Sequence, residues 1–213
     1  MYKALNSSAL FAALFTSGAM FANISPSQAA VINPGFESQF LVQGASTSPI
    51  TGWTGGGVFN PSVSSYFSVP EGSNVAILDS GTIFQDLLEA LVPGNYSLTV
   101  AIGNRLDTAF LGATIEILAG ANVIATNTIA GGAVLDGQFQ YLNAAVNILP
   151  GNPFLGQSVG IRFSTPGPQA SFDDVNFISP PVPFEFSPAL GLSVLAGLGV
   201  MSYMKRRVKL ENN

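Results

Sequence analysis

Short runs of alternating apolar and polar residues, separated by turn residues, recur through the middle of the chain. Every second residue is apolar in residues 96–102, and the same two-residue period is present in 159–164 and 173–177. This period is typical of a β-strand with one buried face. Further strand-like runs are residues 65–69, 75–78, 82–86, 113–119, 123–128 and 139–148. Glycine- and proline-containing turns between them favour an all-β fold, an antiparallel two-sheet β-sandwich. Residues 85–91 suit either a helix or a single turn.

The two ends of the chain are predicted to be targeting segments. Residues 1–29 carry Lys3, an apolar stretch and the small-residue site Ser27-Gln28-Ala29, which together indicate a secretory signal peptide. Residues 189–204 are uncharged and precede a basic cluster, as in a transmembrane helix with a cytoplasmic tail. Residues 30–179 remain as one domain, followed by a C-terminal segment, 180–213. We therefore expect an exported protein with a membrane span near its C-terminus.

Charge and composition restrict the function. Between residues 31 and 179 there are ten acidic residues and two basic ones, Arg105 and Arg162, so the net charge is near −8. This charge argues against a nucleic-acid partner. The chain has no His and no Cys, which excludes a Ser-His-Asp triad, a cysteine nucleophile and a His-ligated zinc. A carboxylate pair of the glycosidase type remains available. We predict that the chain is not an enzyme, with a carbohydrate-active hydrolase as the weaker alternative.

A motif near the C-terminus resembles a known sorting signal. It consists of Pro183, Phe184, Glu185, Phe186, Ser187 and Pro188, and it precedes the apolar stretch 189–204 and the basic tail. This order resembles the PEP-CTERM sorting signal in its cyanobacterial form. The resemblance implies that residues 180–213 are a C-terminal sorting signal. It implies an exported protein that is transiently anchored in the inner membrane and processed there by an exosortase-type protease. It also implies a final location at the cell surface or outside the cell, in association with extracellular polysaccharide.

The order of small motifs in the domain carries a second resemblance. Asn33-Pro-Gly-Phe-Glu37 opens the domain, Gly52-Trp53 follows, and Ser171-Phe-Asp-Asp-Val-Asn-Phe177 closes it. This order resembles the jelly-roll carbohydrate-binding modules and galactose-binding-like sandwiches. The resemblance implies a jelly roll in which the first and last strands lie together.

The same resemblance implies a structural calcium ion held by the carboxylates of Glu37 and Asp173, with the backbone carbonyl of Gly35 or Phe36 as a further ligand. Calcium prefers several oxygen ligands. By strand parity Asp173 shares its face with Val175 and Phe177, so it should point toward the core, where an unpaired carboxylate is costly. The alternative is an ordinary hydrogen-bonded aspartate at the start of a strand.

Aromatic side chains would bind a glycan by stacking on the apolar face of a sugar. The candidates are Trp53, Phe59, Tyr66 and Tyr141. For Trp53 a position in the core is the alternative. We therefore predict a noncatalytic cell-surface or matrix protein that binds polysaccharide. The alternative is a purely structural surface protein without a ligand.

Overall fold

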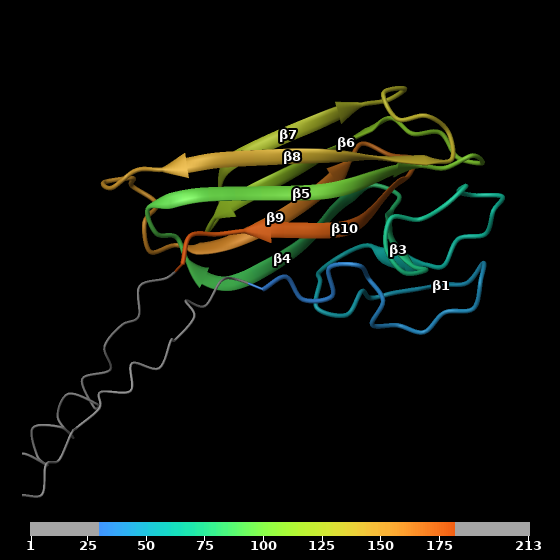
Figure 1. Cartoon of the computed structure of the whole chain (residues 1–213), viewed down its shortest axis with the longest axis horizontal. Coiled ribbons are helices and arrows are strands. Elements are labelled where there is room, and N and C mark those ends of the chain that lie inside the picture. The colour runs from blue at the N-terminus through green and yellow to red at the C-terminus, as the bar shows by residue number, and fades with distance from the viewer. Residues whose placement is uncertain (1–29, 182–213) are drawn as a thin grey trace, which may run out of the picture.

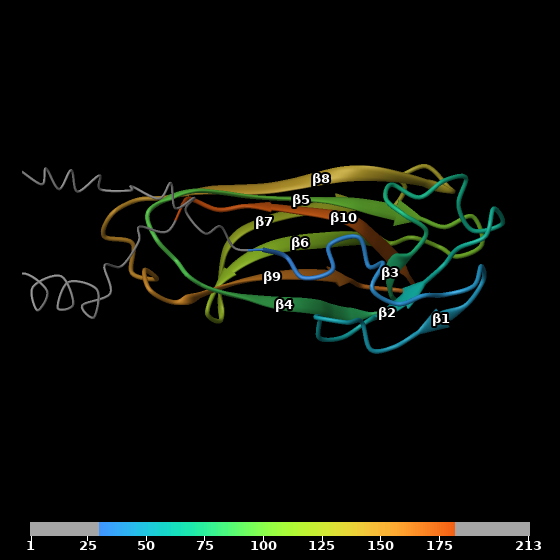
Figure 2. The ribbon, with the colours of Figure 1, turned by 60° about the horizontal axis from the view of Figure 1, so that its bottom comes forward.

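The computed structural model describes residues 30–181, which form two antiparallel β-sheets packed face to face (Figure 1 and Figure 2). The predicted two-sheet β-sandwich is confirmed. Sheet A has the strand order β1-β2-β3-β10-β5-β8 and sheet B the order β4-β9-β6-β7. The strands are β1 (Ser46–Thr47), β2 (Gly57–Phe59), β3 (Val75–Leu78), β4 (Gly81–Ala90), β5 (Gly94–Asn104), β6 (Gly112–Ala119), β7 (Asn122–Ala130), β8 (Gln138–Ile148), β9 (Ser158–Thr165) and β10 (Ala170–Ile178).

The predicted terminal segments lie outside the described residues. This applies to the signal peptide (1–29), the sorting motif (183–188) and the membrane segment (189–204). Between residues 30 and 181 no helix is long and apolar enough to cross a bilayer.

Two of the local predictions differ from the structure. Residues 85–91 are neither helix nor turn, because nearly all of them belong to β4, which pairs with β9. Residues 65–69 form no strand, and their burial does not alternate along the whole run, because Ser65 and Tyr66 are both buried and Phe67 and Ser68 are both exposed. Tyr66 and Phe67 do lie on opposite sides, as expected. The backbone crosses an end of sheet A instead of running along it, and Phe67 N–H donates to the Gly137 carbonyl oxygen at 3.0 Å.

The hydrophobic core lies between the sheets and contains the single tryptophan. The Trp53 ring lies 5.4 Å from the ring of Phe36 and 5.3 Å from that of Phe163, measured between centroids. Phe163 in turn stacks on Phe172 at 5.1 Å. The indole N–H of Trp53 donates to the Ile32 carbonyl oxygen at 2.9 Å, so its polar atom is satisfied inside the core. These contacts attach the N-terminal segment to both sheets.

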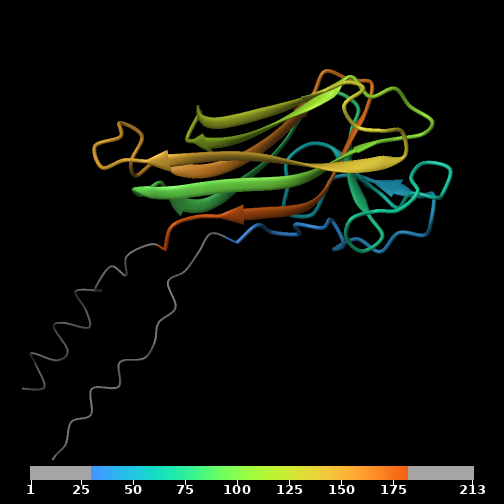
Figure 3. The ribbon, with the colours of Figure 1, turned by 45° about the horizontal axis from the view of Figure 1, so that its top comes forward.

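Strand β5 lies between β10 and β8 in sheet A (Figure 3). Its inward residues Tyr96, Leu98, Val100 and Ile102 are buried, as the two-residue period predicts. On the opposite, outer face it carries small residues, including Ala101 and Gly103. Because β5 pairs with β10 on one side and β8 on the other, two rows of side chains cross this face. One row is Ser171, Gly103 and Phe139, and the other is Asp173, Ala101 and Tyr141.

A β-bulge in β10 places Asp173 and Val175 on opposite faces of the sheet. Asp173 pairs with Ala101 but Asn176 pairs with Thr99, so β10 has one residue more than β5 at this point. Asp174 adopts φ 47°, in the left-handed region. An extra residue inverts the alternation of faces. Phe172 and Val175 therefore both point to the core, and Asp173 lies on the outer face. The parity argument that placed Asp173 on the face of Val175 is wrong for this reason.

Candidate functional site

Five side chains gather on the outer face of sheet A, around the two rows that cross β10, β5 and β8. We call this group the outer-face site, and its members are Tyr66, Phe139, Tyr141, Ser171 and Asp173. Four of them come from the paired strands, and Tyr66 comes from the segment that crosses the end of the sheet. The strands fix the positions of the four, while the crossing segment covers them.

The floor of the site depends on a glycine. A Cβ atom at Gly103 would lie 2.5 Å from Phe139 Cε1, so the Phe139 ring lies over the backbone of β5 only because residue 103 has no side chain. The Tyr66 ring packs on Phe139 with 4.6 Å between centroids. Beside Phe139, an open pocket of about 360 Å³ is lined by Phe67, Ser68, Val69, Pro70, Gly137, Gln138, Phe139 and Tyr141. Three aromatic rings and two aliphatic side chains thus form the walls of this pocket.

Two hydroxyl groups in the site, Tyr66 Oη and Ser171 Oγ, are buried and have no hydrogen-bonding contact among the described residues except with each other. Burial of Tyr66 raises the pKa of its phenol well above the usual range, and the neighbouring Ser171 hydroxyl acts in the opposite direction. The Tyr66 hydroxyl therefore stays protonated. Buried polar groups that lack a well-formed hydrogen bond are uncommon in folded proteins. The pair therefore retains hydrogen-bonding capacity beyond this mutual contact.

Asp173 is the buried acid of the outer-face site. Its side chain is fully buried, and it accepts two backbone N–H groups. Glu71 N–H donates to Oδ2 at 3.0 Å and Asp174 N–H donates to Oδ1 at 2.8 Å. Burial nevertheless raises the pKa of Asp173 to about 7, and the neighbouring charges of Glu71 and Asp174 act in the same direction. A carboxyl with this pKa holds a proton at neutral pH in a large fraction of molecules and can give it up.

Tyr141 lines the aromatic pocket and is hydrogen-bonded to Asp174, the residue that follows Asp173. Its hydroxyl donates to Asp174 Oδ2 at 2.6 Å. This hydrogen bond, together with partial burial and the nearby carboxylates, raises the pKa of Tyr141 to about 12. Asp174 thus accepts the hydrogen bond of Tyr141, whereas Asp173 is buried and pushed toward its neutral form. The two adjacent acids have different surroundings.

A segment that we call the strap, residues 67–74, runs over Asp173. Its first residue is tied to Gly137, as described above. Its last residues are tied to the Glu37 carboxylate, which accepts Ser73 N–H at 2.8 Å and Asn74 N–H at 2.5 Å. Between these two anchors, residues 68–72 make one hydrogen bond within the described structure, from Glu71 N–H to Asp173.

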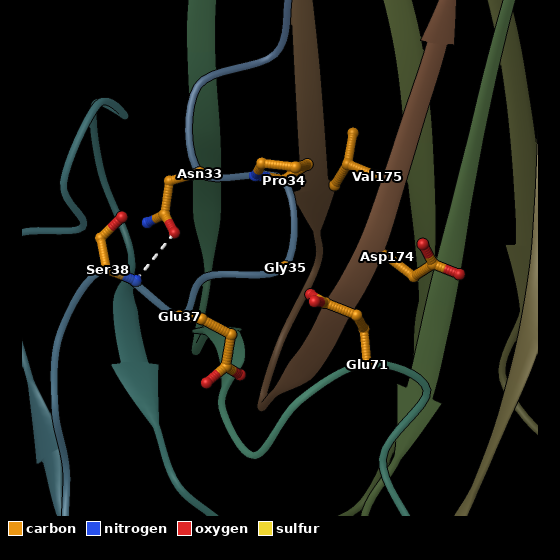
Figure 4. A pocket seen from close by; sticks show the side chains of 8 residues that line it. All are labelled: Asn33, Pro34, Gly35, Glu37, Ser38, Glu71, Asp174 and Val175. Carbon is orange, nitrogen blue, oxygen red and sulfur yellow. Dashed lines mark hydrogen bonds between the residues drawn. The ribbon is translucent and has the colours of Figure 1, made fainter.

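The residues predicted to bind calcium lie close together, but they serve the strap in this structure. Glu37 and Asp173 both accept backbone N–H groups of the strap, and the Glu71 carboxylate lies against Gly35. Beside them is an open pocket of about 600 Å³ that is lined in part by the carboxylates of Glu37, Glu71 and Asp174, but not by Asp173. In Figure 4 these three carboxylates point in different directions. Within residues 30–181 no three His, Cys, Asp or Glu side chains are grouped so as to hold a metal ion, so calcium binding stays a prediction.

The four aromatic candidates divide into two pairs. Trp53 and Phe59 are buried, Trp53 in the core and Phe59 beneath the guanidinium of Arg105 at 4.9 Å, so neither presents a ring to solvent. Tyr66 and Tyr141 both belong to the outer-face site. The sequence did not indicate Phe139 and Ser171, which lie beside Tyr66 and Tyr141 in the outer-face site. The two-residue period placed Phe139 in a strand, but only the pairing of β5 with β8 shows that it faces a glycine.

Comparisons with known proteins agree on one group. A family model described as HpiC1-like, HpiC1 cyclase, matches residues 27–178. An apo cyclase from Fischerella sp. superposes with a TM-score of 0.66 at 27% identity, covering 75% of this chain and 99% of that one.

Two further structures from Fischerella sp. TAU contain ligands. A cyclase in complex with 4-(1H-indol-3-yl)butan-2-one has a TM-score of 0.64 at 26% identity, covering 74% of this chain and 100% of that one. The Stig cyclase Fisc, in complex with (3Z)-3-(1-methyl-2-pyrrolidinylidene)-3H-indole, has a TM-score of 0.65 at 26% identity, covering 75% and 100%. No curated protein matches the sequence. Two carbohydrate-binding modules superpose with TM-scores of only 0.36 and 0.43, too low to support an inference.

Proposed function

The chain belongs to the HpiC1-like cyclase family, and from this premise we propose that it closes a ring in a small indole-bearing molecule by acid catalysis at the outer-face site. The observation that carries the proposal is Asp173. It is a fully buried carboxyl whose pKa is raised to about 7. Strand β5 lies between Asp173 and Tyr141, which lines the aromatic pocket of about 360 Å³.

Family membership corrects three predictions made from sequence. The expectation of a noncatalytic surface protein is wrong, because the family consists of cyclases, which are enzymes. The assignment to PEP-CTERM sorting-signal proteins with a carbohydrate-binding module is replaced by the cyclase family. Binding to extracellular polysaccharide finds no support either. The location of the protein and its processing protease stay predictions, because they rest on residues outside 30–181.

The chemistry follows from the protonation of Asp173. A general acid works best when its pKa lies near the working pH, and burial places Asp173 there. The neutral carboxyl donates its proton to an electron-rich atom of the substrate, and the resulting cation is attacked by another atom of the same molecule to close the ring. The carboxylate then takes a proton back from the cyclised product. The reaction is a net isomerisation, and it requires neither a nucleophilic His nor a Cys.

The pocket determines the kind of molecule that fits. A volume of about 360 Å³ suits a ligand of the size of a substituted indole. Phe67, Phe139 and Tyr141 present rings against which a flat aromatic molecule packs. Two ligands in the related cyclase structures carry an indole ring system, and this supports an indole-bearing substrate here. The hydroxyls of Tyr66 and Ser171 are available to bind a polar group of that substrate.

The proposal predicts binding of 4-(1H-indol-3-yl)butan-2-one that depends on Tyr141. Isothermal titration of the described domain with this compound is expected to give saturable binding. Tyr141→Leu should raise Kd about 5-fold to 10-fold, since an aromatic contact contributes up to about 1.5 kcal/mol.

The matched control is Phe40→Leu, which also removes an exposed ring, because Phe40 is 94% exposed and lines none of the pockets described above. This variant should bind like the wild type. Equal weakening by both substitutions, or no binding by the wild type at millimolar ligand, would count against the proposed site.

A further inference from the structure

The position of Asp173 creates a difficulty for the proposed chemistry. Its side chain has no exposed surface, and it is absent from the lining of the aromatic pocket, which includes Tyr141 and residues 67–70 of the strap. A carboxyl that donates a proton must come within hydrogen-bond distance of the substrate. What separates the acid from the pocket is the middle of the strap.

The strap is built to move at this point. Residues 68–72 lie outside every β-ladder, and residues 68, 71 and 72 are exposed. Pro70 and Gly72, the latter with φ 57°, flank Glu71. The hydrogen bond from Glu71 N–H to Asp173 is the only one that holds these five residues within the described structure. Segments with few backbone hydrogen bonds open at low free-energy cost.

The two ends of the strap are held more firmly. Ser73 and Asn74 donate to the Glu37 carboxylate, and Asn74 also donates through Nδ2 to the Gln39 carbonyl oxygen at 2.9 Å. At the other end Phe67 is bonded to Gly137, and the preceding residue Tyr66 is buried against Phe139. Fixed ends around a weakly held middle are the arrangement of a hinged lid.

Three pockets meet at the strap. Besides the aromatic pocket, a pocket of about 220 Å³ is lined in part by residues 67–69, Gly72 and Ser73. The 600 Å³ pocket lies on the other side, where Glu71 reaches toward Gly35 (Figure 4). An outward movement of residues 68–72 would join these spaces above Asp173.

We propose that residues 68–72 form a lid over Asp173, and that the lid opens when Glu71 N–H leaves Asp173 Oδ2. Opening connects the carboxyl with the aromatic pocket and admits the substrate. Closing seals the acid from bulk water. Glu71 is thus a positioning residue that acts through its backbone. The inference rests on the proposed function for its purpose, but the opening itself is measurable without any substrate.

A reversible disulfide tests the lid. A Cβ atom at Gly35 would lie 2.4 Å from Glu71 Cδ, and Gly35 does not have a positive φ. Cysteines at 35 and 71 therefore come near the Cβ–Cβ separation of about 3.5–4.5 Å that a disulfide needs. The chain contains no other cysteine, so the Gly35→Cys/Glu71→Cys variant forms this disulfide or none. It keeps the Glu71 N–H bond to Asp173, and the same protein in reductant is its own control.

The readout is labelling of Asp173 by a water-soluble carbodiimide and an amine, quantified by peptide mass spectrometry. Labelling of Asp173 is expected to fall at least about 10-fold when the disulfide forms and to recover on reduction, while exposed Asp79 labels equally in both states. Equal labelling of Asp173 in both states, or none in wild-type protein, overturns the lid.

A second pair of variants covers failure of the cysteines to cross-link. Glu71→Pro lacks the N–H that bonds Asp173, whereas Glu71→Ala keeps it. Asp173 should label several-fold faster in Glu71→Pro than in Glu71→Ala, and equal rates contradict the proposal. Because labelling needs no substrate, gated labelling without binding of the indole ligand would refute the proposed function and leave the lid standing.

Discussion

Asp173→Asn is expected to lower kcat/KM for ring closure by about 10³-fold, within the range that general acids contribute. Asparagine has nearly the same shape but has no acidic proton to donate. The probe is an indole with an alkenyl chain at C3. Cyclisation leaves its mass unchanged, so the product is detected by a new retention time at the same mass.

Two aspartate substitutions make this result specific. Asp79→Asn makes the same chemical change at an exposed position and should leave turnover within 2-fold of wild type. Asp174→Asn should cost less than Asp173→Asn, because an asparagine amide oxygen can still accept the hydrogen bond that the Tyr141 hydroxyl donates to Asp174. If Asp174→Asn were the more damaging of the two, the proton donor would have to be reassigned to Asp174.

The second large effect is on stability. The pKa of Asp173 is about 7 in the folded protein against 3.8 as its ordinary value, so the folded state binds more protons between these values. Stability from this group is therefore fully present below about pH 4 and is lost as the pH rises through about 7. The whole window corresponds to about 4 kcal/mol, of which about 2.5 kcal/mol falls between pH 5 and pH 8.

Urea unfolding at pH 5 and pH 8 measures this contribution. The wild type should lose about 2.5 kcal/mol more than Asp173→Asn between the two pH values. All other carboxylates titrate in both proteins, so their contributions cancel in the comparison. An identical loss in both proteins would mean that Asp173 titrates normally, and the basis for its role as an acid would disappear.

The sandwich was predictable because its strands have one buried face. In β5 the inward residues Tyr96, Leu98, Val100 and Ile102 are all buried, and the two-residue period reports this directly. The short strands β1 and β2 were not predicted. They contain only two and three residues, too few to display a period.

The site was predictable only in part, because it depends on pairing and on one irregularity. The sequence singles out Asp173, Glu37 and Gly35 as residues that come together, and they do so around the strap. The bulge that puts Asp173 and Val175 on opposite faces has no local signature, since the left-handed residue there is Asp174 and not glycine. Counting back from Val175 and Phe177 along a strictly regular strand would have placed the carboxyl in the core.

The prediction that the chain is not an enzyme failed for a chemical reason. The absence of His and Cys excludes nucleophilic triads and His-ligated metals. The remaining candidate, a carboxylate pair, assumes that two acids act together. Acid-catalysed isomerisation needs one carboxyl in a dry environment. That requirement concerns burial, which composition does not report.

The bulge in β10 also lets one strand serve two surfaces at once. Phe172 and Val175 are three residues apart and could not both face the core in a regular strand, and the extra residue allows both to do so. Asp173 faces outward next to Phe172, and Asp174, with φ 47°, accepts the hydrogen bond of the Tyr141 hydroxyl. The interior and the outer face of the sandwich are thus specified by different residues of the same short segment, so the outer face can change in sequence while the interior is kept.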